Sequence, residues 1–505
     1  MILPPLNRRA LFAGFSALPL GLALSRTASA AQTGTTIPEL VIDLPGAPES
    51  IDPALAYSPR DWSIVHSIYD SLIQFDETGE LIPLAAESFT STDATTFAVK
   101  LRAGLLFHDG APVTTDALAR SIDYVKSSES FAVDLFSTIE RVDIVDELNA
   151  SIVCSAPSPW LAAQIAVWVL LIPEGFTADI AASAPNGSGP YVFESYVPDS
   201  EIVLTRNEAY TWESPKGTPL ADRVVYRFVP EATTRVADLA SDSVQIITEV
   251  PLDQESAVEA AGSTLTVEPI VGIGFIRVPN DVEPFIDARV RQALNHAVDL
   301  QTIATALLGD EVKRIATVYP DDRSLGFDSD LDPYDFDPDK ARQLLTDAGY
   351  PDGFTTQLET TSAARIDVAE AIVDQLADVG ITVELVSSDL AAFNAGWSDQ
   401  TRPALRMVTW SPLFEPHTFL SLVFITGGYL ARYSNGEVDA AFAAASIEPD
   451  SDARTEHLRE VGRLLHDDPA AIYLWNLVTS YGVADEASTW APRGDEYVVP
   501  TSTEQ

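Results

Sequence analysis

Side chains that could perform catalysis are scattered along this chain of 505 residues. Six histidines are dispersed, and among 75 acidic residues a neighbouring pair of carboxylates carries little information. The sequence contains neither the G-x-S-x-G motif of a nucleophile elbow nor the H-E-x-x-H motif of a zinc peptidase. His108 adjoins Asp109, but both belong to a Phe-His-Asp-Gly segment that is typical of a structural turn. These patterns argue against an enzyme.

Two segments contain the residue types of ion-binding loops without their full patterns. Residues 328–332 place aspartates at alternate positions, as a calcium loop does, but Pro333 stands where that loop needs glycine. Residues 186–191 are glycine-rich, yet no Lys-Ser/Thr pair follows, so a turn is favoured over a phosphate loop. The single cysteine, Cys154, excludes an intramolecular disulfide and a cysteine metal cluster. We therefore expect no cofactor and no metal site.

The elements that would position a site are clearest near the N-terminus. Apolar residues recur at helical spacing over residues 61–72 and predict an amphipathic helix. Apolar and polar residues alternate over 97–101, as on a half-buried strand. A second helix is predicted to begin near Asp116, with Thr114 or Thr115 as its cap.

Further along, the pattern alternates between strands and helices. Residues 222–250 read as strand, helix and strand, an order that suits a sheet covered by helices. The most apolar run, 161–172, contains Gln164 and is too short for a membrane span, so it predicts a core helix. A helix is predicted to begin after Asp337 as its N-cap and to end at Gly349.

The formal net charge of -45, with an isoelectric point near 4.2, is extreme. A polyanion without a basic cluster does not bind nucleic acid or an anionic membrane surface, so neither is expected as a partner. The charge is explained by solubility or a saline habitat, or by attraction of a cationic ligand; the first two are favoured.

Residues 1–30 have the form of an export signal. Arg8 and Arg9 precede a short apolar run, and a small-residue cleavage site ends at Ala30, a pattern that favours the twin-arginine route. No cysteine follows the cleavage site to accept a lipid anchor. We therefore expect a soluble protein, periplasmic or otherwise outside the cytoplasmic membrane.

A series of motifs in fixed order resembles the family 5 extracellular solute-binding proteins of ABC importers, which include oligopeptide-, dipeptide- and nickel-binding proteins. The motifs extend over nearly the whole chain after residue 30. They are IDPA at 51–54, KLRAGLLFHDGAPVTTD at 100–116, GSGPY at 187–191, RNEAYTW at 206–212, PFIDARVRQALNHAVD at 284–299, DPDKARQLLTDAGYPDGF at 337–354 and YSNGEVD at 433–439. The segment 284–299 is the most specific match, and His296 within it is interpreted as a buried structural histidine.

The resemblance implies a mixed α/β fold like that of periplasmic binding proteins. Two main lobes and an extra small domain would have interleaved connectivity and close about a hinge. The implied boundaries are 1–30 for the signal peptide, 31–71, 186–270 and 481–505 for domain I, 72–185 for domain II, and 271–480 for domain III.

In this family the solute lies between domains that close on it, in a cleft lined by aromatic and polar groups. Carried over position by position, the resemblance implies a set of residues that face the solute. They are Tyr57 and Ser58 after the first strand, Gly274 and Phe275 before the third domain, Trp410, Ser411 and Glu415 in the loop 409–416, and Trp397, Arg406 and Trp475 nearby.

One position departs from the family pattern. Peptide-binding relatives carry an aspartate shortly after the tryptophan of the loop, and it pairs with the terminal ammonium of the ligand. Leu413 stands there in this chain. A buried ammonium without a carboxylate partner is costly, so either Glu415 substitutes or the ligand is not anchored by a free N-terminus.

We therefore expect a monomeric solute-binding protein that captures a peptide or another small organic solute and catalyses nothing. Its partners would be membrane permease subunits with cytoplasmic ATPases. The family also serves nickel complexes, sugars and opines. Two alternatives stay open: an extracellular hydrolase with an unrecognised active site, and a ligand-dependent sensor or chaperone on the same fold.

Overall fold

The computed structural model describes residues 37–361, 365–397 and 404–502. All elements below belong to one unit, Ile37–Gln505. The expected signal peptide, residues 1–30, lies outside the described residues. Among those residues, no helix has both the length and the apolar character needed to span a bilayer.

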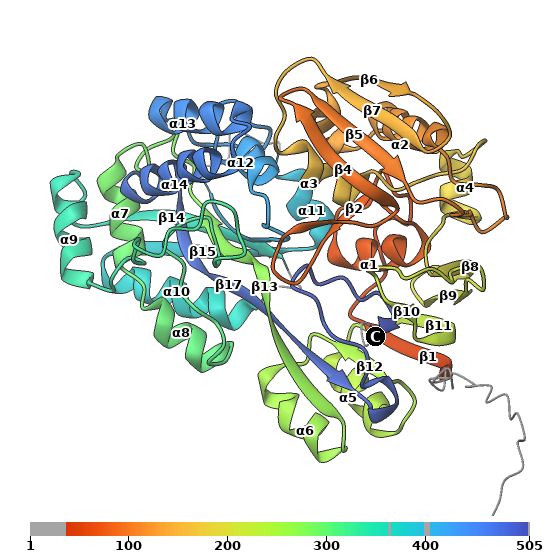
Figure 1. The fold of residues 1–505 in the computed structure, drawn as a ribbon. Coiled ribbons are helices and arrows are strands. Elements are labelled where there is room, and N and C mark those ends of the chain that lie inside the picture. Colours follow the sequence, from red (N-terminus) through yellow and green to blue (C-terminus); the bar gives the residue numbers. More distant parts are fainter. Residues whose placement is uncertain (1–36, 362–364, 398–403, 503–505) are drawn as a thin grey trace, which may run out of the picture. The chain divides into compact units, whose positions relative to one another are not determined.

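A ten-stranded mixed sheet dominates the structure (Figure 1). Its strands in spatial order are β15 (Ile381–Ser388), β14 (Phe354–Thr361), β16 (Leu405–Trp410), β13 (Thr264–Arg277), β17 (Ala471–Val483), β12 (Ile246–Thr248), β1 (Ile37–Leu44), β11 (Ala221–Phe228), β9 (Glu201–Arg206) and β8 (Tyr191–Val197). The pairs of β1 with β11 and β12, and of β14 with β15 and β16, are parallel. The sheet therefore joins an N-terminal group of strands to a C-terminal group.

Two long strands make that connection. β13 and β17 pair antiparallel from Thr264 opposite Val483 to Arg277 opposite Ala471. β12 pairs with β17 at residues 481–483, and β16 pairs with β13 at 273–277. Between these contacts, among the strands described, residues 267–270 and 477–480 pair only with each other. We call this two-stranded stretch the ribbon.

A separate four-stranded antiparallel sheet is inserted between β1 and β8 in the sequence (Figure 1). It consists of β4 (Ala86–Asp93), β5 (Thr96–Leu101), β7 (Asn149–Cys154) and β6 (Ile139–Ile144). Two short pairs complete the strands, β2 (Ile73–Phe75) with β3 (Leu81–Pro83) and β10 (Thr218–Pro219) with β18 (Thr501–Ser502). Phe97, Val99 and Leu101 on β5 are buried, as their alternation predicts, and so is Cys154.

Helices account for most of the remaining regular structure. They are α1 (Pro59–Ile68), α2 (Thr115–Ser127), α3 (Leu161–Trp168), α4 (Ala178–Ser183), α5 (Ala232–Ala240), α6 (Glu255–Ala260), α7 (Ala288–His296), α8 (Leu300–Leu307), α9 (Pro338–Asp347), α10 (Ile366–Asp378), α11 (Leu390–Ala395), α12 (His417–Val423), α13 (Gly436–Ile447) and α14 (Ser451–Asp467), with 3₁₀ turns η1 (Phe131–Phe136), η2 (Leu252–Gln254) and η3 (Asp485–Ala487).

Several helix boundaries follow from local chemistry. The side chain of Asp337 accepts a hydrogen bond from the Lys340 N–H, and Pro338 occupies the first turn of α9, as predicted. Thr114 is the N-cap residue of α2, but its side chain makes no capping hydrogen bond. His296, at the end of α7, is buried and bonds through Nδ1 to the Asp335 carbonyl, which agrees with a structural role.

Two predicted helices are shorter than their apolar patterns. α1 ends at Ile68 instead of residue 72, because Gly187 and Gly189 pack directly against the Ile68 carbonyl. A Cβ at Gly187 would lie 2.1 Å from that oxygen, so glycine is required there. α3 ends at Trp168 instead of residue 172, since Leu170 forms a β-bridge with Ser71. Contacts distant in sequence set both ends.

Candidate functional site

A cavity of about 1260 Å³ opens among α1, α3, α11, the segment after β16 and strand β17. Segments from both groups of strands in the large sheet line it, and so does α3, which follows the four-stranded sheet in the sequence. Seven of the residues implied by the family resemblance lie on its wall: Tyr57, Ser58, Trp397, Trp410, Ser411, Glu415 and Trp475. This wall is thus where most of the expected site residues meet.

Trp410 ends β16 and leads into the loop that departs from the family pattern. Its ring packs on Phe419 with a centroid distance of 5.0 Å and faces the cavity. Leu413, three residues later, is fully buried in the hydrophobic core, and its N–H donates to the Val271 carbonyl at 2.6 Å. The residue that replaces the family aspartate therefore lies outside the described wall.

Trp397 lies on the wall, and its ring makes cation–π contacts with two arginines. The guanidinium carbons of Arg277 and Arg406 lie 4.7 and 4.8 Å from its ring centroid. Arg406 is itself buried, lies 4.1 Å from the ring of Phe393 and is paired with Glu359 at 3.3 Å. Arg406 does not reach the wall, contrary to expectation; it supports Trp397 by cation–π contact.

Gly274 and Phe275 also lie behind the wall. Gly274 on β13 is opposite Trp475 on β17, and a Cβ at this glycine would lie 3.2 Å from the indole Nε1. The absence of a side chain at Gly274 therefore leaves room for the indole. Phe275 is fully buried and packs edge to face on Phe419, 5.5 Å away, beneath Trp410. Both residues shape the wall without forming its surface.

Tyr57 and Ser58 reach the wall from the segment before α1. Tyr57 is exposed, which leaves its phenol ring available to a solute. The hydroxyl of Ser58 instead caps α1, because it accepts the N–H of Asp61, while the Asp61 carboxylate accepts the Ser58 N–H. Ser58 thus contributes surface while its hydroxyl serves the helix.

The Glu415 carboxylate already has partners within the protein. Its two oxygens accept hydrogen bonds from Arg454 at 2.7 and 2.8 Å, a bidentate buried ion pair. The carboxylate also accepts the His417 N–H at 3.0 Å. An ammonium group of a solute would have to compete with Arg454 for this carboxylate, so Glu415 does not replace the missing aspartate.

Of the seven acidic residues on the described wall, only Glu415 was expected from the sequence, and Glu496 and Glu249 are two of the other six. Glu496 accepts hydrogen bonds from Ser411 Oγ at 2.9 Å and Thr479 Oγ1 at 2.8 Å, and burial raises the pKa of its carboxyl to about 7. Glu249 follows β12 and also lines the cavity. Neither belongs to a recognisable motif, and Glu496 is 85 residues away from Ser411 in the sequence.

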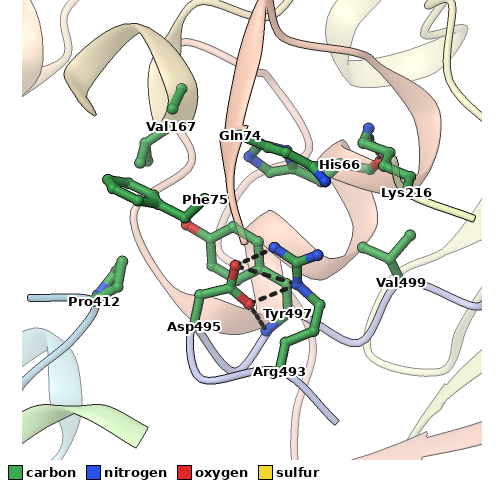
Figure 2. A pocket seen from close by; sticks show the side chains of 11 residues that line it. His66, Gln74, Phe75, Val167, Lys216, Pro412, Arg493, Asp495, Tyr497 and Val499 are labelled. Atoms are coloured by element: carbon green, nitrogen blue, oxygen red, sulfur yellow. Dashed lines mark hydrogen bonds and ion pairs between the residues drawn. The ribbon is translucent and has the colours of Figure 1, made fainter. Parts of the chain in front are cut away.

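A second, much smaller cavity of about 20 Å³ adjoins the first, and Phe75, Val167 and Pro412 border both. Figure 2 shows it between α1 and the C-terminal segment, with Arg493 paired to Asp495. Burial and the nearby Lys216 ammonium hold the pKa of His66 well below its usual value. A volume of this size accommodates a single water molecule.

Comparisons with known proteins show which family the chain belongs to. Residues 80–430 match the model of the bacterial extracellular solute-binding proteins, family 5. The glutathione-binding protein GsiB of Pectobacterium atrosepticum is 28% identical over 426 residues, which cover 78% of this chain and 80% of that protein.

Solved structures agree on the fold. The periplasmic binding protein DppA of Helicobacter pylori, in complex with the peptide STSA, has a TM-score of 0.81 at 20% identity and covers 92% of this chain and 98% of that chain. The oligopeptide-binding protein AppA of Bacillus subtilis, in complex with a nonapeptide, has a TM-score of 0.78 at 20% identity and covers 92% and 97%. These structures confirm the expected mixed α/β binding-protein fold. The chain therefore belongs to the bacterial extracellular solute-binding proteins of family 5, and it is the solute-binding component of an ABC importer.

Proposed function

We propose that the protein captures a short peptide in the large cavity. The observation that carries this proposal is the wall itself, on which the indoles of Trp397, Trp410 and Trp475 surround about 1260 Å³ together with polar groups. Aromatic walls with a few placed polar groups are typical of sites for organic solutes, and this volume exceeds that of most single-metabolite pockets. GsiB is named for glutathione, a tripeptide-sized solute.

We further propose that capture is coupled to closure about the ribbon, with domains divided as the motifs imply. Residues 475–480 of β17 line the cavity, and 477–480 belong to the ribbon, so a solute contacts the strand that would bend. A solute shifts such an equilibrium only by its difference in affinity for the two states. Since the family consists of binding proteins, we propose that the solute leaves chemically unchanged.

A thermal-shift screen of the chain from Ala31 onward tests the solute class. The panel is glutathione, peptides of two to six residues, oligosaccharides, opines and nickel chelates. A solute that binds only the native state adds about 2.7 kcal/mol of stability at 100 times its dissociation constant. We expect peptides to raise the melting temperature and to be recovered unchanged by mass spectrometry. A shift by sugars or nickel chelates alone would contradict the peptide class.

We also propose that residues 1–30 direct twin-arginine export and that the mature chain carries no lipid. The support is the Arg8-Arg9 pair before an apolar run and the fact that Ala31, not a cysteine, directly follows the cleavage site. Replacing both arginines by lysine is expected to retain the protein in the cytoplasm, as measured by cell fractionation. The mass of the exported wild-type chain checks cleavage before Ala31 and the absence of lipid.

A further inference from the structure

Glu496 is held at the cavity wall by two hydroxyl groups. Ser411, next to Trp410, donates to Oε2, and Thr479 on β17 donates to Oε1. Each carboxylate oxygen can accept a further hydrogen bond, so the acceptor capacity is not exhausted. The side chain therefore lies at a fixed place beside the tryptophan loop and one strand of the ribbon.

The backbone at Glu496 and Glu249 is strained. Glu496 has a φ of 65° and Glu249 a φ of 51°, both in the left-handed region that side-chain-bearing residues rarely adopt. Such conformations cost free energy and persist where the surroundings impose them, commonly at functional sites. Among the described residues, two of the four non-glycine residues in this region therefore lie on one cavity wall.

Glu496 lies near two other acidic side chains, Glu249 and Asp495. The Glu249 carboxylate is close enough to raise the pKa of Glu496 further, as is Asp495, which is paired with Arg493. Among the described residues, no lysine or arginine forms an ion pair with Glu249 or Glu496. The described wall carries seven carboxylates and three guanidinium groups, so it is acidic overall.

Of those three arginines, Arg235 lies beside Glu249 and its charge acts on the Glu249 carboxylate, whereas Arg365 is paired elsewhere. Arg235 donates to the backbone carbonyls of Val229, Pro230, Thr248 and Glu249. Arg365 pairs with Asp367. Arg60, in the first turn of α1, is the third. Arg235 thus offsets part of the charge of Glu249, while Glu496 itself has no ion-pair partner among the described residues, and a cation that enters the cavity can take that place.

We propose that Glu496, assisted by Glu249, is the subsite that receives a protonated amine of the solute. This inference rests on the proposed capture of a peptide and names the group by which the peptide is recognised. An ammonium carries three donors, which match the free acceptor sites of two adjacent carboxylates. Glu496, in the C-terminal segment, then supplies the carboxylate that pairs with the ammonium of the solute. Leu413, at the family position in the tryptophan loop, cannot supply it.

A purely structural role would not require a charge at position 496. A glutamine could bond to both hydroxyl groups, because its amide has one acceptor and one donor end, without the cost of burying a carboxylate. The charge is therefore useful only if it meets an opposite charge. This difference makes Glu496→Gln a conservative test that keeps the hydrogen-bonded geometry.

The test compares free and acetylated amines by isothermal titration calorimetry. Glutathione and trialanine, each with a free and an N-acetylated α-amine, are titrated into wild type and E496Q. We expect E496Q to lower the affinity for free amines at least tenfold and to leave the affinity for acetylated forms unchanged. Equal binding of free amines by wild type and E496Q would overturn the subsite.

Glu268→Gln is the matched control. Glu268 lies opposite Thr479 on the ribbon but is not on the cavity wall, and its partner is Arg323. E268Q removes one carboxylate charge next to the same strand residue, Thr479, but away from the cavity wall, so it is expected to keep the preference for free amines. If E268Q lost that preference as E496Q does, the effect would be one of overall charge, and the subsite would be contradicted.

The pH dependence supplies a readout that a structural role would not produce. The Glu496 carboxyl in the free protein takes up a proton near pH 7, so affinity for an amine is expected to fall as the pH is lowered through that value. The titratable groups that face it are Glu249, Asp495, Tyr481 and Tyr497, and the neutral Ser411 and Thr479 hydroxyls bond to it. E496Q should abolish the fall near pH 7; a fall that persists in E496Q would count against the subsite.

A fragment separates this inference from the peptide proposal. 2-Phenylethylamine carries the ring and the ammonium, and 2-phenylethanol carries the ring without the charge. If the amine alone stabilises wild type and neither stabilises E496Q, the subsite stands even where peptides fail to bind. If peptides bind while both fragments act alike on wild type and E496Q, peptide capture stands and the subsite is overturned.

Discussion

Lys216→Met is expected to lower the free energy of unfolding by about 3–5 kcal/mol, the cost of breaking a buried ion pair by removing one partner. The Lys216 ammonium lies 2.9 Å from Asp70 Oδ1, and both side chains are nearly inaccessible to solvent. It also donates to the carbonyls of His66 and Tyr69 at 2.7 and 2.6 Å, at the C-terminal end of α1. Methionine would leave the buried Asp70 carboxylate without a counter-ion, with Tyr210 still donating to it, and would remove the Lys216 hydrogen bonds to both carbonyls.

Urea unfolding measures this cost from the midpoint at constant slope. Lys100→Met is the matched control, because Lys100 pairs with Glu87 at a similar 2.7 Å but with both side chains about half exposed. An exposed pair of this kind contributes less than about 1 kcal/mol. In a second variant, Asp70→Leu combined with Lys216→Met, part of the loss should be recovered. Equal losses in K216M and K100M would contradict the role of burial.

Trp410→Ala is expected to weaken solute binding by about 30- to 150-fold, or roughly 2–3 kcal/mol, which is typical of a tryptophan at the centre of a binding surface. The indole lies on the cavity wall and packs on Phe419, which also lines the cavity, so its loss removes wall surface and exposes more of the Phe419 ring. Calorimetry with the peptide that gives the largest thermal shift measures the change.

Trp212→Ala provides the comparison for Trp410. Trp212 is also partly exposed and contacts other groups, with Tyr210 at 5.3 Å and the Arg102 guanidinium at 5.3 Å, but it lies outside the cavity wall. Its removal is expected to reduce stability without changing affinity. If W212A weakened binding as much as W410A, the loss would reflect general destabilisation, and Trp410 would not be a contact residue.

Local patterns predicted the elements that local chemistry determines. The strand at 97–101 and the N-cap at Asp337 follow from alternation and capping, which involve neighbours in sequence. The ends of α1 and α3 did not follow from such patterns. Gly187 packs on the Ile68 carbonyl, and Lys216 donates to the His66 carbonyl in the same helix. These contacts join segments that are more than a hundred residues apart in the sequence.

The residues of the candidate site also fall into two groups, those that motifs predicted and those that depend on contacts distant in sequence. Trp410 and Trp475 could be located because the motifs around them have a fixed order in the family. Arg406 looked equivalent in sequence, but the Phe393 and Trp397 rings enclose it, and only packing reveals this. Glu496 could not be found, because among 75 acids nothing in its neighbours marks it. Its importance comes from Ser411 and Thr479, which reach it only in the folded chain.

The stretch 475–480 of β17 has a consequence for how this protein can evolve. All six residues line the cavity, and the last four also form one edge of the ribbon. A substitution there that suits a new nutrient also alters the stiffness of the connection between the two groups of strands. Tyr57 and Trp397 line the cavity but lie outside the ribbon, so substitutions there do not alter its stiffness. When the bound solute changes during evolution, we therefore expect Tyr57 and Trp397 to vary first. Residues 477–480 remain selected both for solute contact and for the stiffness of the ribbon.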